Sequence, residues 1–198
     1  MHVSHLNLRQ LVSAFVIALC CGLSAQASEN ERAAENESAW SALKKPGTII
    51  LFRHATAPGG GDPAGYVLND CKTQRNLDEV GRAQARRIGE RFREQGVKAE
   101  AVLTSQWCRT RETAQLAFPG LPKDAPAFNS FFNDRGTEAA QTAAARKQLL
   151  TWRGGGVLVV VTHQVNITAL TGVSPDSGEG VIVHRQGREL AVVARLQP

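Results

Sequence analysis

Two short apolar runs constrain the fold of this chain more than any other feature. Residues 48–52 read Thr-Ile-Ile-Leu-Phe and residues 157–161 read Val-Leu-Val-Val-Val. Runs of this length without polar alternation are typical of strands that are buried on both faces of a sheet. Because longer segments with helical periodicity separate them, the chain is predicted to fold as an α/β protein.

The remaining segments extend this pattern to a three-layer architecture, with a mainly parallel sheet, helices on both faces and a closing pair of antiparallel C-terminal strands. Residues 55–76 are rich in glycine and proline and are predicted to form a long loop, which in a compact domain is commonly functional. Further strands are expected at 101–104, 180–184 and 189–196, helices at 78–95, 107–117, 137–152 and 165–171, and a second loop at 118–126.

The first 27 residues have the anatomy of a secretory signal peptide. An apolar run at 11–23 is too short to span a bilayer, where about 20 apolar residues are needed, and Ala25-Gln26-Ala27 matches a cleavage pattern. We therefore expect cleavage after Ala27, a periplasmic or secreted protein, and no stable membrane insertion after cleavage. The alternatives are an N-terminal membrane anchor and a buried helix. Residues 28–45 are predicted to be a polar lead-in and residues 46–198 a single domain.

The net charge of +5 admits nucleic acids, anionic membranes and small anions as partners. Arginines cluster in the helix expected at 78–95, but Glu90 and Glu94 interleave with them, as on an ordinary solvated helix face. Basic and aromatic residues do not alternate along the chain as they do in nucleic-acid binders. The charge pattern and the expected export therefore predict no nucleic-acid partner.

Four cysteines are too few for a disulfide scaffold in a chain of 198 residues. Cleavage after Ala27 would remove Cys20 and Cys21. Cys71 and Cys108 would remain, either as one disulfide in an oxidising compartment or as two free thiols.

Basic side chains follow the apolar strands where each strand ends. Arg53 and His54 follow the first run, His163 follows the other, and Arg109 lies near the start of a predicted helix. Ligands of open α/β sheets bind outside the carboxyl ends of the strands, where helix N-termini also favour anions. Two arginines and two histidines converging there suit a tetrahedral dianion such as phosphate. A structural role for each histidine is the alternative.

Four motifs, in their order along the chain, resemble those of the histidine phosphatase superfamily, which is phosphoglycerate-mutase-like. Residues 53–55 (Arg-His-Ala) are similar to its signature after the first strand, and residues 77–85 to its Leu-x-x-x-Gly-x-x-Gln-Ala helix start. Residues 105–114 are similar to its Ser-x-x-x-Arg-Thr-x-x-Thr-Ala segment, and residues 161–163 to the strand that carries its second histidine.

This resemblance implies a mechanism without a metal or another cofactor. His54 would attack phosphorus and form a phosphohistidine intermediate. Arg53, Arg109 and His163 would bind the phosphoryl oxygens and stabilise their charge in the transition state.

An alkoxide leaving group would also need a general acid. Residues 164–166 (Gln-Val-Asn) exclude the branch of the family in which the acid directly follows the second histidine. The candidates are therefore Asp124, Asp134 and Glu138. Asp134 is preferred because an apolar stretch turns polar there, and its alternative role is to cap the following helix.

Two departures from the family's pattern point to specificity. Gln164 replaces a glycine common after the second histidine, and the loop over 57–75 is longer and more polar than a minimal pocket rim. We expect Gln164 and Asn69 to lie near the substrate. A disulfide between Cys71 and Cys108 would hold this loop beside the second arginine.

The sequence thus predicts a phosphomonoester hydrolase that acts outside the cytoplasm on a small-molecule or glycan phosphomonoester, such as an envelope sugar phosphate. Two alternatives stay open: a non-catalytic phosphate-binding protein that keeps the pocket, and a phosphohistidine-protein phosphatase. The sequence contains no Cys-x5-Arg, Walker or His-Glu-x-x-His motif, which argues against other phosphatase and metal chemistries.

Overall fold

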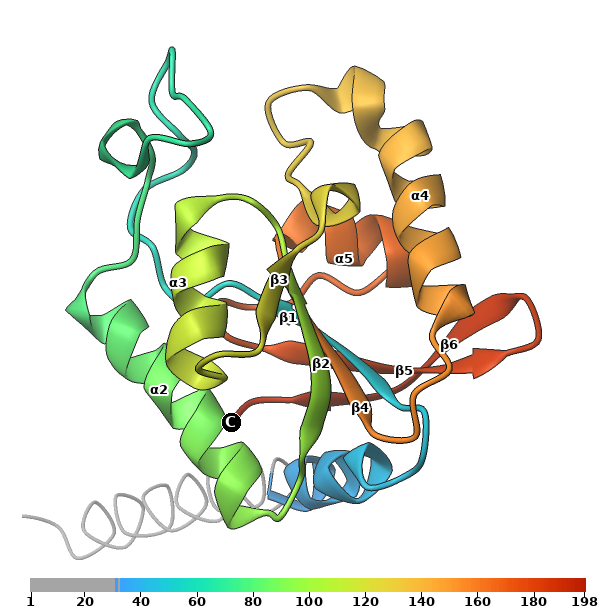
Figure 1. Ribbon diagram of the computed structural model, residues 1–198. Coiled ribbons are helices and arrows are strands. Elements are labelled where there is room, and N and C mark those ends of the chain that lie inside the picture. The colour runs from blue at the N-terminus through green and yellow to red at the C-terminus, as the bar shows by residue number, and fades with distance from the viewer. Residues whose placement is uncertain (1–30, 32) are drawn as a thin grey trace, which may run out of the picture.

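The computed structural model describes residue 31 and residues 33–198 (Figure 1). The predicted signal peptide and its cleavage site lie outside the described residues. Residues 33–43 form a helix that packs on the sheet through the buried Trp40 and Leu43. None of the helices in the described part of the chain has the length and apolar character that crossing a bilayer requires.

A six-stranded mixed sheet in the order β3-β2-β4-β1-β5-β6 organises the fold. The first four strands in this order run parallel, and β5 and β6 are antiparallel neighbours that close the sheet, as predicted. The strands are β1 (Ile49–Arg53), β2 (Ala99–Thr104), β3 (Pro122–Asp124), β4 (Val157–Thr162), β5 (Gly180–Gln186) and β6 (Glu189–Leu196).

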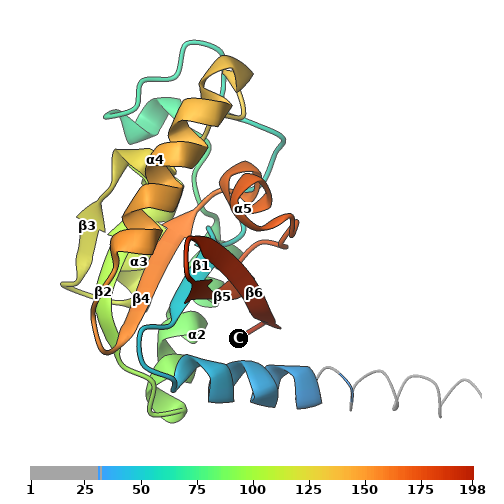
Figure 2. The same cartoon turned by 90° about the vertical axis from the view of Figure 1, so that its right-hand side faces the viewer.

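Helices cover both faces of the sheet, so the predicted three-layer architecture is confirmed (Figures 1 and 2). In β1, Ile50 and Phe52 pack under α2, α3 and the N-terminal helix, whereas Ile49 and Leu51 pack under α4 and α5. The helices are α2 (Glu79–Glu94), α3 (Cys108–Ala117), α4 (Glu138–Thr151) and α5 (Gln164–Thr171), with short 3-10 turns η1 (Cys71–Thr73), η2 (Pro126–Phe128) and η3 (Arg135–Thr137).

The edge strand β3 lies inside the segment that the sequence predicts to be a loop. It pairs with β2 over three residues only, beginning at Pro122. A strand this short, which starts at a residue without an N–H donor and follows Gly120, carries no periodic signal. Its pairing therefore depends on the neighbouring strand and not on local propensity.

The start of α2 fixes the chain that leaves β1. The Asp78 carboxylate caps the helix by accepting from the backbone N of Gly81 at 2.7 Å. A Cβ at Gly81 would collide with the carbonyl oxygen of Thr56, so only glycine permits this close approach. The Gln84 amide accepts from the Thr56 backbone N at 2.9 Å and donates to the Ser177 carbonyl at 2.7 Å. The glycine and glutamine of the helix-start motif thus hold the loop that follows β1.

Candidate active site

A cavity of about 130 Å³ opens beyond the carboxyl ends of β1 and β4. The loop over 55–76 and the segment over 129–137 both project past this end of the sheet (Figures 1 and 2). The cavity is the crevice that the parallel topology predicts. Its lining residues are Arg53, His54, Gly59, Gly60, Gly61, Asp62, Arg75, Arg109, Ser130, Phe132, His163, Gln164 and Val165.

His54 lies directly after β1 and is 2% exposed. Its Nδ1 is 2.7 Å from the Ala55 carbonyl oxygen, an acceptor, so Nδ1 carries the proton and Nε2 keeps its lone pair. Burial, followed by the positive charge of Arg109, lowers the pKa of His54 to about 3. The ring is therefore neutral at physiological pH, with one nitrogen available as a nucleophile.

His163 precedes α5, and its ring centroid lies 5.6 Å from that of His54. Its Nδ1 is 3.3 Å from Nη2 of Arg109, which can only donate, and its Nε2 is 2.8 Å from Oγ of Ser105. Nε2 therefore carries the proton. Burial and the charge of Arg109 lower the pKa of His163 well below its usual value, so this ring is neutral too.

Three guanidinium groups line the cavity, although the sequence analysis anticipated only two. Each is tethered to a protein oxygen through Nη1: Arg53 to the Pro175 carbonyl at 3.1 Å, Arg109 to Asp62 at 2.8 Å, and Arg75 to the Ala57 carbonyl. The Nε atom of each is buried and has no acceptor among the described residues. Buried donors normally find a partner, and all three arginines line the one cavity, so this cavity is suited to a ligand with several oxygens.

Burial lowers the pKa of all three arginines, and nearby carboxylates oppose this effect. Arginine nevertheless stays protonated in proteins. With neutral histidines, the three cations and the single lining carboxylate of Asp62 leave a net charge of +2 (3 − 1). The cavity thus matches a dianion.

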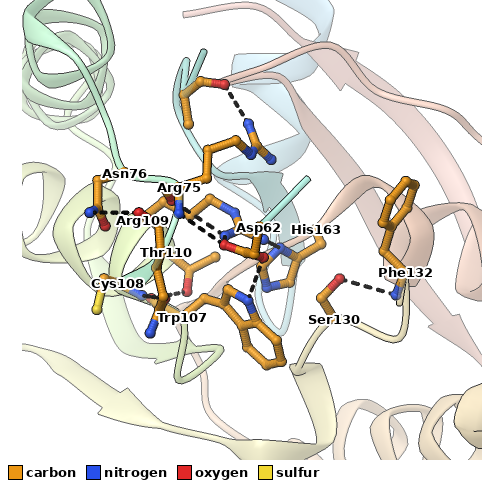
Figure 3. A network of polar contacts seen from close by, with 12 residues as sticks. Asp62, Arg75, Asn76, Trp107, Cys108, Arg109, Thr110, Ser130, Phe132 and His163 are labelled. Atoms are coloured by element: carbon orange, nitrogen blue, oxygen red, sulfur yellow. Dashed lines mark hydrogen bonds and ion pairs between the residues drawn. The ribbon is translucent and has the colours of Figure 1, made fainter. Parts of the chain in front are cut away.

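Asp62 links two sides of the cavity and is the only carboxylate among its lining residues. Oδ1 accepts from the backbone N of Arg75 at 3.0 Å and from Nη1 of Arg109 at 2.8 Å, and Oδ2 accepts from Nε1 of Trp107 at 3.0 Å (Figure 3). The side chains of Asp62 and Arg109 are each 4% exposed. Sequence reasoning missed Asp62 and Arg75, because the only signal for them is their place in a long loop.

The preferred acid, Asp134, does not line the cavity. It is exposed, and its Oδ1 accepts from the backbone N of Gly136 at 3.1 Å, so it caps η3. The expectation of a partly desolvated acid there was wrong, because a cap at the start of a helix gives the same change from apolar to polar residues. The other candidates also lie elsewhere: Glu138 pairs with Arg135, and Asp124 with Arg111.

The two residues expected near the substrate are separated. Gln164 lines the cavity, and its Nε2 donates to Oγ of Ser174 at 2.8 Å. Asn69 is exposed and does not line the cavity.

A disulfide joins Cys71 to Cys108, with their Cα atoms 5.6 Å apart. This is one of the two alternatives that the sequence left open. Oε1 of Gln74 also accepts from the backbone N of Cys108 at 3.0 Å. Both links tie the loop to the first turn of α3, directly before Arg109.

Within residues 33–198, no three His, Cys, Asp or Glu side chains are grouped as metal ligands would be.

The comparisons with known proteins agree with this geometry. Residues 49–126 match the model of the histidine phosphatase superfamily (branch 1). This segment contains Arg53, His54, Asp62, Arg75 and Arg109. A search of curated proteins gave no significant match.

Solved structures show the same fold at low sequence identity. A proposed α-ribazole-5'-P phosphatase from Escherichia coli K-12 has a TM-score of 0.60 at 16% identity, covering 76% of this chain and 96% of its own. A phosphoserine phosphatase from Entamoeba histolytica, in complex with 3-phosphoglyceric acid, has 0.55 at 13%, covering 76% and 97%. The protein histidine phosphatase SixA, complexed with tungstate, has 0.50 at 16%, also covering 76% and 97%. Residues 49–126 are thus similar to the histidine phosphatase superfamily, and the chain shares its fold with these solved structures.

Proposed function

We propose that this protein is a metal-independent phosphohydrolase that works through a phosphohistidine at His54. The observation that carries this proposal is the neutral, buried His54, whose Nε2 keeps its lone pair at a cavity that three arginines also line. In the first step Nε2 attacks phosphorus, and the bond from phosphorus to the leaving group breaks. In the second step water attacks the phosphohistidine, which yields inorganic phosphate and restores His54.

The arginines supply the electrostatic part of the proposed catalysis. Charge on the transferring phosphoryl group stays spread over its equatorial oxygens, so fixed cations stabilise it throughout the displacement. Arg53 and Arg109 are held in place by Pro175 and Asp62. Preorganised donors of this kind need no rearrangement during the reaction.

The candidate substrates differ in whether their leaving group needs a proton from an acid of the protein. Among the described residues, Asp62 is the only carboxylate that lines the cavity, and its two oxygens already accept from three donors. A leaving group that takes its proton from solvent therefore suits this site better than a simple alkoxide. This favours a second candidate substrate, a phosphoramidate such as phosphohistidine, whose imidazole can be protonated by water on its distal nitrogen.

The proposed setting is outside the cytoplasm. The first candidate substrate there is a small-molecule or glycan phosphomonoester, such as an envelope sugar phosphate, whose leaving oxygen would take its proton from a water molecule because Asp62 is already engaged. The signal-peptide pattern of the first 27 residues and the disulfide between Cys71 and Cys108 support this setting. The rim supports a substrate with a ring, because Phe132 is 51% exposed there and Gln164 offers an amide.

Turnover by matched variants tests the proposal. The mature protein would be assayed with p-nitrophenyl phosphate, sugar phosphates, phosphoserine and phosphoramidate. His54→Ala should abolish phosphate release from every substrate that the wild type hydrolyses. His184→Gln, which changes a histidine in β5, should leave release unchanged. Absence of turnover in the whole panel, together with tight phosphate binding, would instead support a non-catalytic phosphate-binding protein.

A further inference from the structure

The loop over 55–76 supplies one wall of the cavity. We propose that Arg75 is a third arginine ligand of the phosphoryl group, and that Asp62 is the residue that positions it together with Arg109. This inference rests on the proposed phosphoryl chemistry at His54 and extends the binding site to a loop that lies between the sequence motifs at 53–55 and 77–85.

The guanidinium of Arg75 is oriented for such a contact. Its Nη1 donates to the Ala57 carbonyl, and its Nε is buried without an acceptor among residues 33–198. Because a guanidinium is a rigid plane, the bond at Nη1 also fixes the direction of Nε. The residue lines the same cavity as His54 and His163, and its positive charge contributes to the low pKa of both rings. Arg75 is therefore a fixed donor next to the proposed nucleophile.

Asp62 couples this arginine to Arg109. A single oxygen, Oδ1, accepts from the Arg75 backbone and from the Arg109 side chain, and Oδ2 accepts from Trp107 on the opposite side (Figure 3). The carboxylate is almost fully buried, so its hydrogen bonds are poorly screened by solvent. It fixes the separation between one arginine on the loop and one on α3. Asp62 would thus act through the two arginines and need not touch the substrate.

The charge of the cavity explains why a third arginine is useful. Asp62 cancels one positive charge, so Arg53 and Arg109 alone would leave +1 (2 − 1). Arg75 raises the net charge to +2, which matches a phosphate dianion. The ligand role of Arg75 therefore predicts a preference for dianionic over monoanionic phosphate.

Binding and turnover are measured together for four variants of the mature, oxidised protein. They are Arg75→Gln, Arg75→Lys, Asp62→Asn and the control Arg86→Gln, which changes an exposed arginine of α2. Inorganic phosphate is the probe for calorimetry at pH 7.5, and circular dichroism checks the fold. Loss of one charge-assisted contact should weaken phosphate binding and lower kcat/KM about 10- to 100-fold in Arg75→Gln. Arg75→Lys should recover part of the loss because it keeps the charge, and Arg86→Gln should match wild type.

Combining Asp62→Asn with Arg75→Gln separates positioning from general stability. If Asp62 acts through Arg75, phosphate binding in the double variant should fall by less than the product of the two single losses. Independent, multiplicative losses would overturn the positioning role. Should Asp62→Asn fail to fold, phosphate binding by Arg75→Gln and Arg75→Lys still decides the ligand role.

The outcomes also distinguish this inference from the proposed function. Phosphate release that depends on His54 but changes less than twofold in Arg75→Gln, with unchanged phosphate affinity, would overturn the third-arginine role alone. Phosphate binding that depends on Arg75 in a wild type without turnover would support the ligand role and contradict the proposed function.

Discussion

The cavity has two walls that are held in different ways. The framework wall consists of Arg53, His54, Arg109 and His163, which sit at strand ends or helix starts and inherit their positions from the sheet. The backbone N of His54, for example, donates to the Thr162 carbonyl at 2.9 Å, next to the β1–β4 pairing.

The loop wall consists of Asp62 and Arg75 on the long loop over 55–76. It is held by side-chain links: the Asp62 hydrogen bonds, the contact from Gln74 to α3 and the disulfide. The strands and helices alone therefore position the framework wall, whereas the loop wall also needs side-chain hydrogen bonds and a disulfide to hold it in place. Changes in the framework wall should abolish chemistry, and changes in the loop wall should give graded losses.

Among the residues that hold the two walls together, the largest effect is expected at Arg109, where the walls meet. Arg109→Ala should lower kcat about 10²- to 10³-fold, as for the loss of a preorganised donor to the transition state. It should also lower the free energy of unfolding by about 3–5 kcal/mol, because it leaves the buried Asp62 carboxylate unpaired. Steady-state kinetics and urea unfolding measure the two effects. Loss of stability with kcat intact would show that Arg109 belongs to the fold and not to the site.

Breaking the disulfide tests how the loop wall is fastened. The Cys71→Ser/Cys108→Ser variant should lose about 2–4 kcal/mol of unfolding free energy, since the bridge closes a loop across a sequence separation of 37 residues. Its kcat/KM should fall only a few-fold, because Asp62 and Gln74 still attach the loop to α3. Thermal unfolding and kinetics of this variant, beside reduced wild type, measure both. A complete loss of turnover would mean that the disulfide, and not Asp62, holds this wall.

The pH dependence of stability tests the two histidines of the framework wall. The pKa of His54 is about 3 in the folded protein and about 6.5 in the unfolded chain. Below pH 6.5 the unfolded chain binds a proton that the folded protein does not bind. The stabilisation is therefore complete above pH 6.5 and is lost as the pH falls toward 3. Between pH 6 and pH 5, the shifted pKa of His54 should lower the free energy of unfolding by about 1.2 kcal/mol, and His163 should act in the same direction.

Urea unfolding of wild type and His54→Asn at several pH values checks this expectation. The variant should lose stability less steeply as the pH falls through this range. Equal slopes would contradict the low pKa of His54.

The smallest effect is expected at the rim, outside both walls. Phe132→Ala should leave the affinity for inorganic phosphate unchanged, because the ring is half exposed at the mouth of the cavity. It should raise KM about 2- to 10-fold for substrates whose leaving group contains a ring, as expected for the loss of an aromatic contact. KM values for a ring-containing and a short-chain phosphomonoester provide the comparison. Equal changes in KM for both substrates would show that Phe132 does not contact the ring of the leaving group.

The framework wall could be predicted from the sequence and the loop wall could not, for a physical reason. Arg53, His54 and His163 follow apolar strands, so periodicity and sheet topology together place them at one edge. Asp62 and Arg75 are fixed by contacts to α3 that join distant parts of the chain and leave no local pattern. The sequence predicts that residues 55–76 form a functional loop. It does not predict which side chains of this loop point into the cavity.

Two errors have the same origin. Asp134 looked like a desolvated acid because the sequence around it changes from apolar to polar, which is also the signature of the cap that it forms on η3. The strand β3 was predicted to be a loop because its pairing with β2 depends on tertiary contact. Local sequence therefore describes the regular elements well and describes short or loop-borne features poorly.

Direct trapping of the phosphoenzyme tests the central claim most directly. The mature protein would be mixed with a turned-over phosphomonoester, quenched in alkali within milliseconds, and digested for mass spectrometry. Our account predicts one phosphate on His54, acid-labile and alkali-stable, that is absent from His54→Ala and present in His184→Gln. Phosphate release at full rate without a phosphorylated His54, or with the phosphate on another residue, would contradict it.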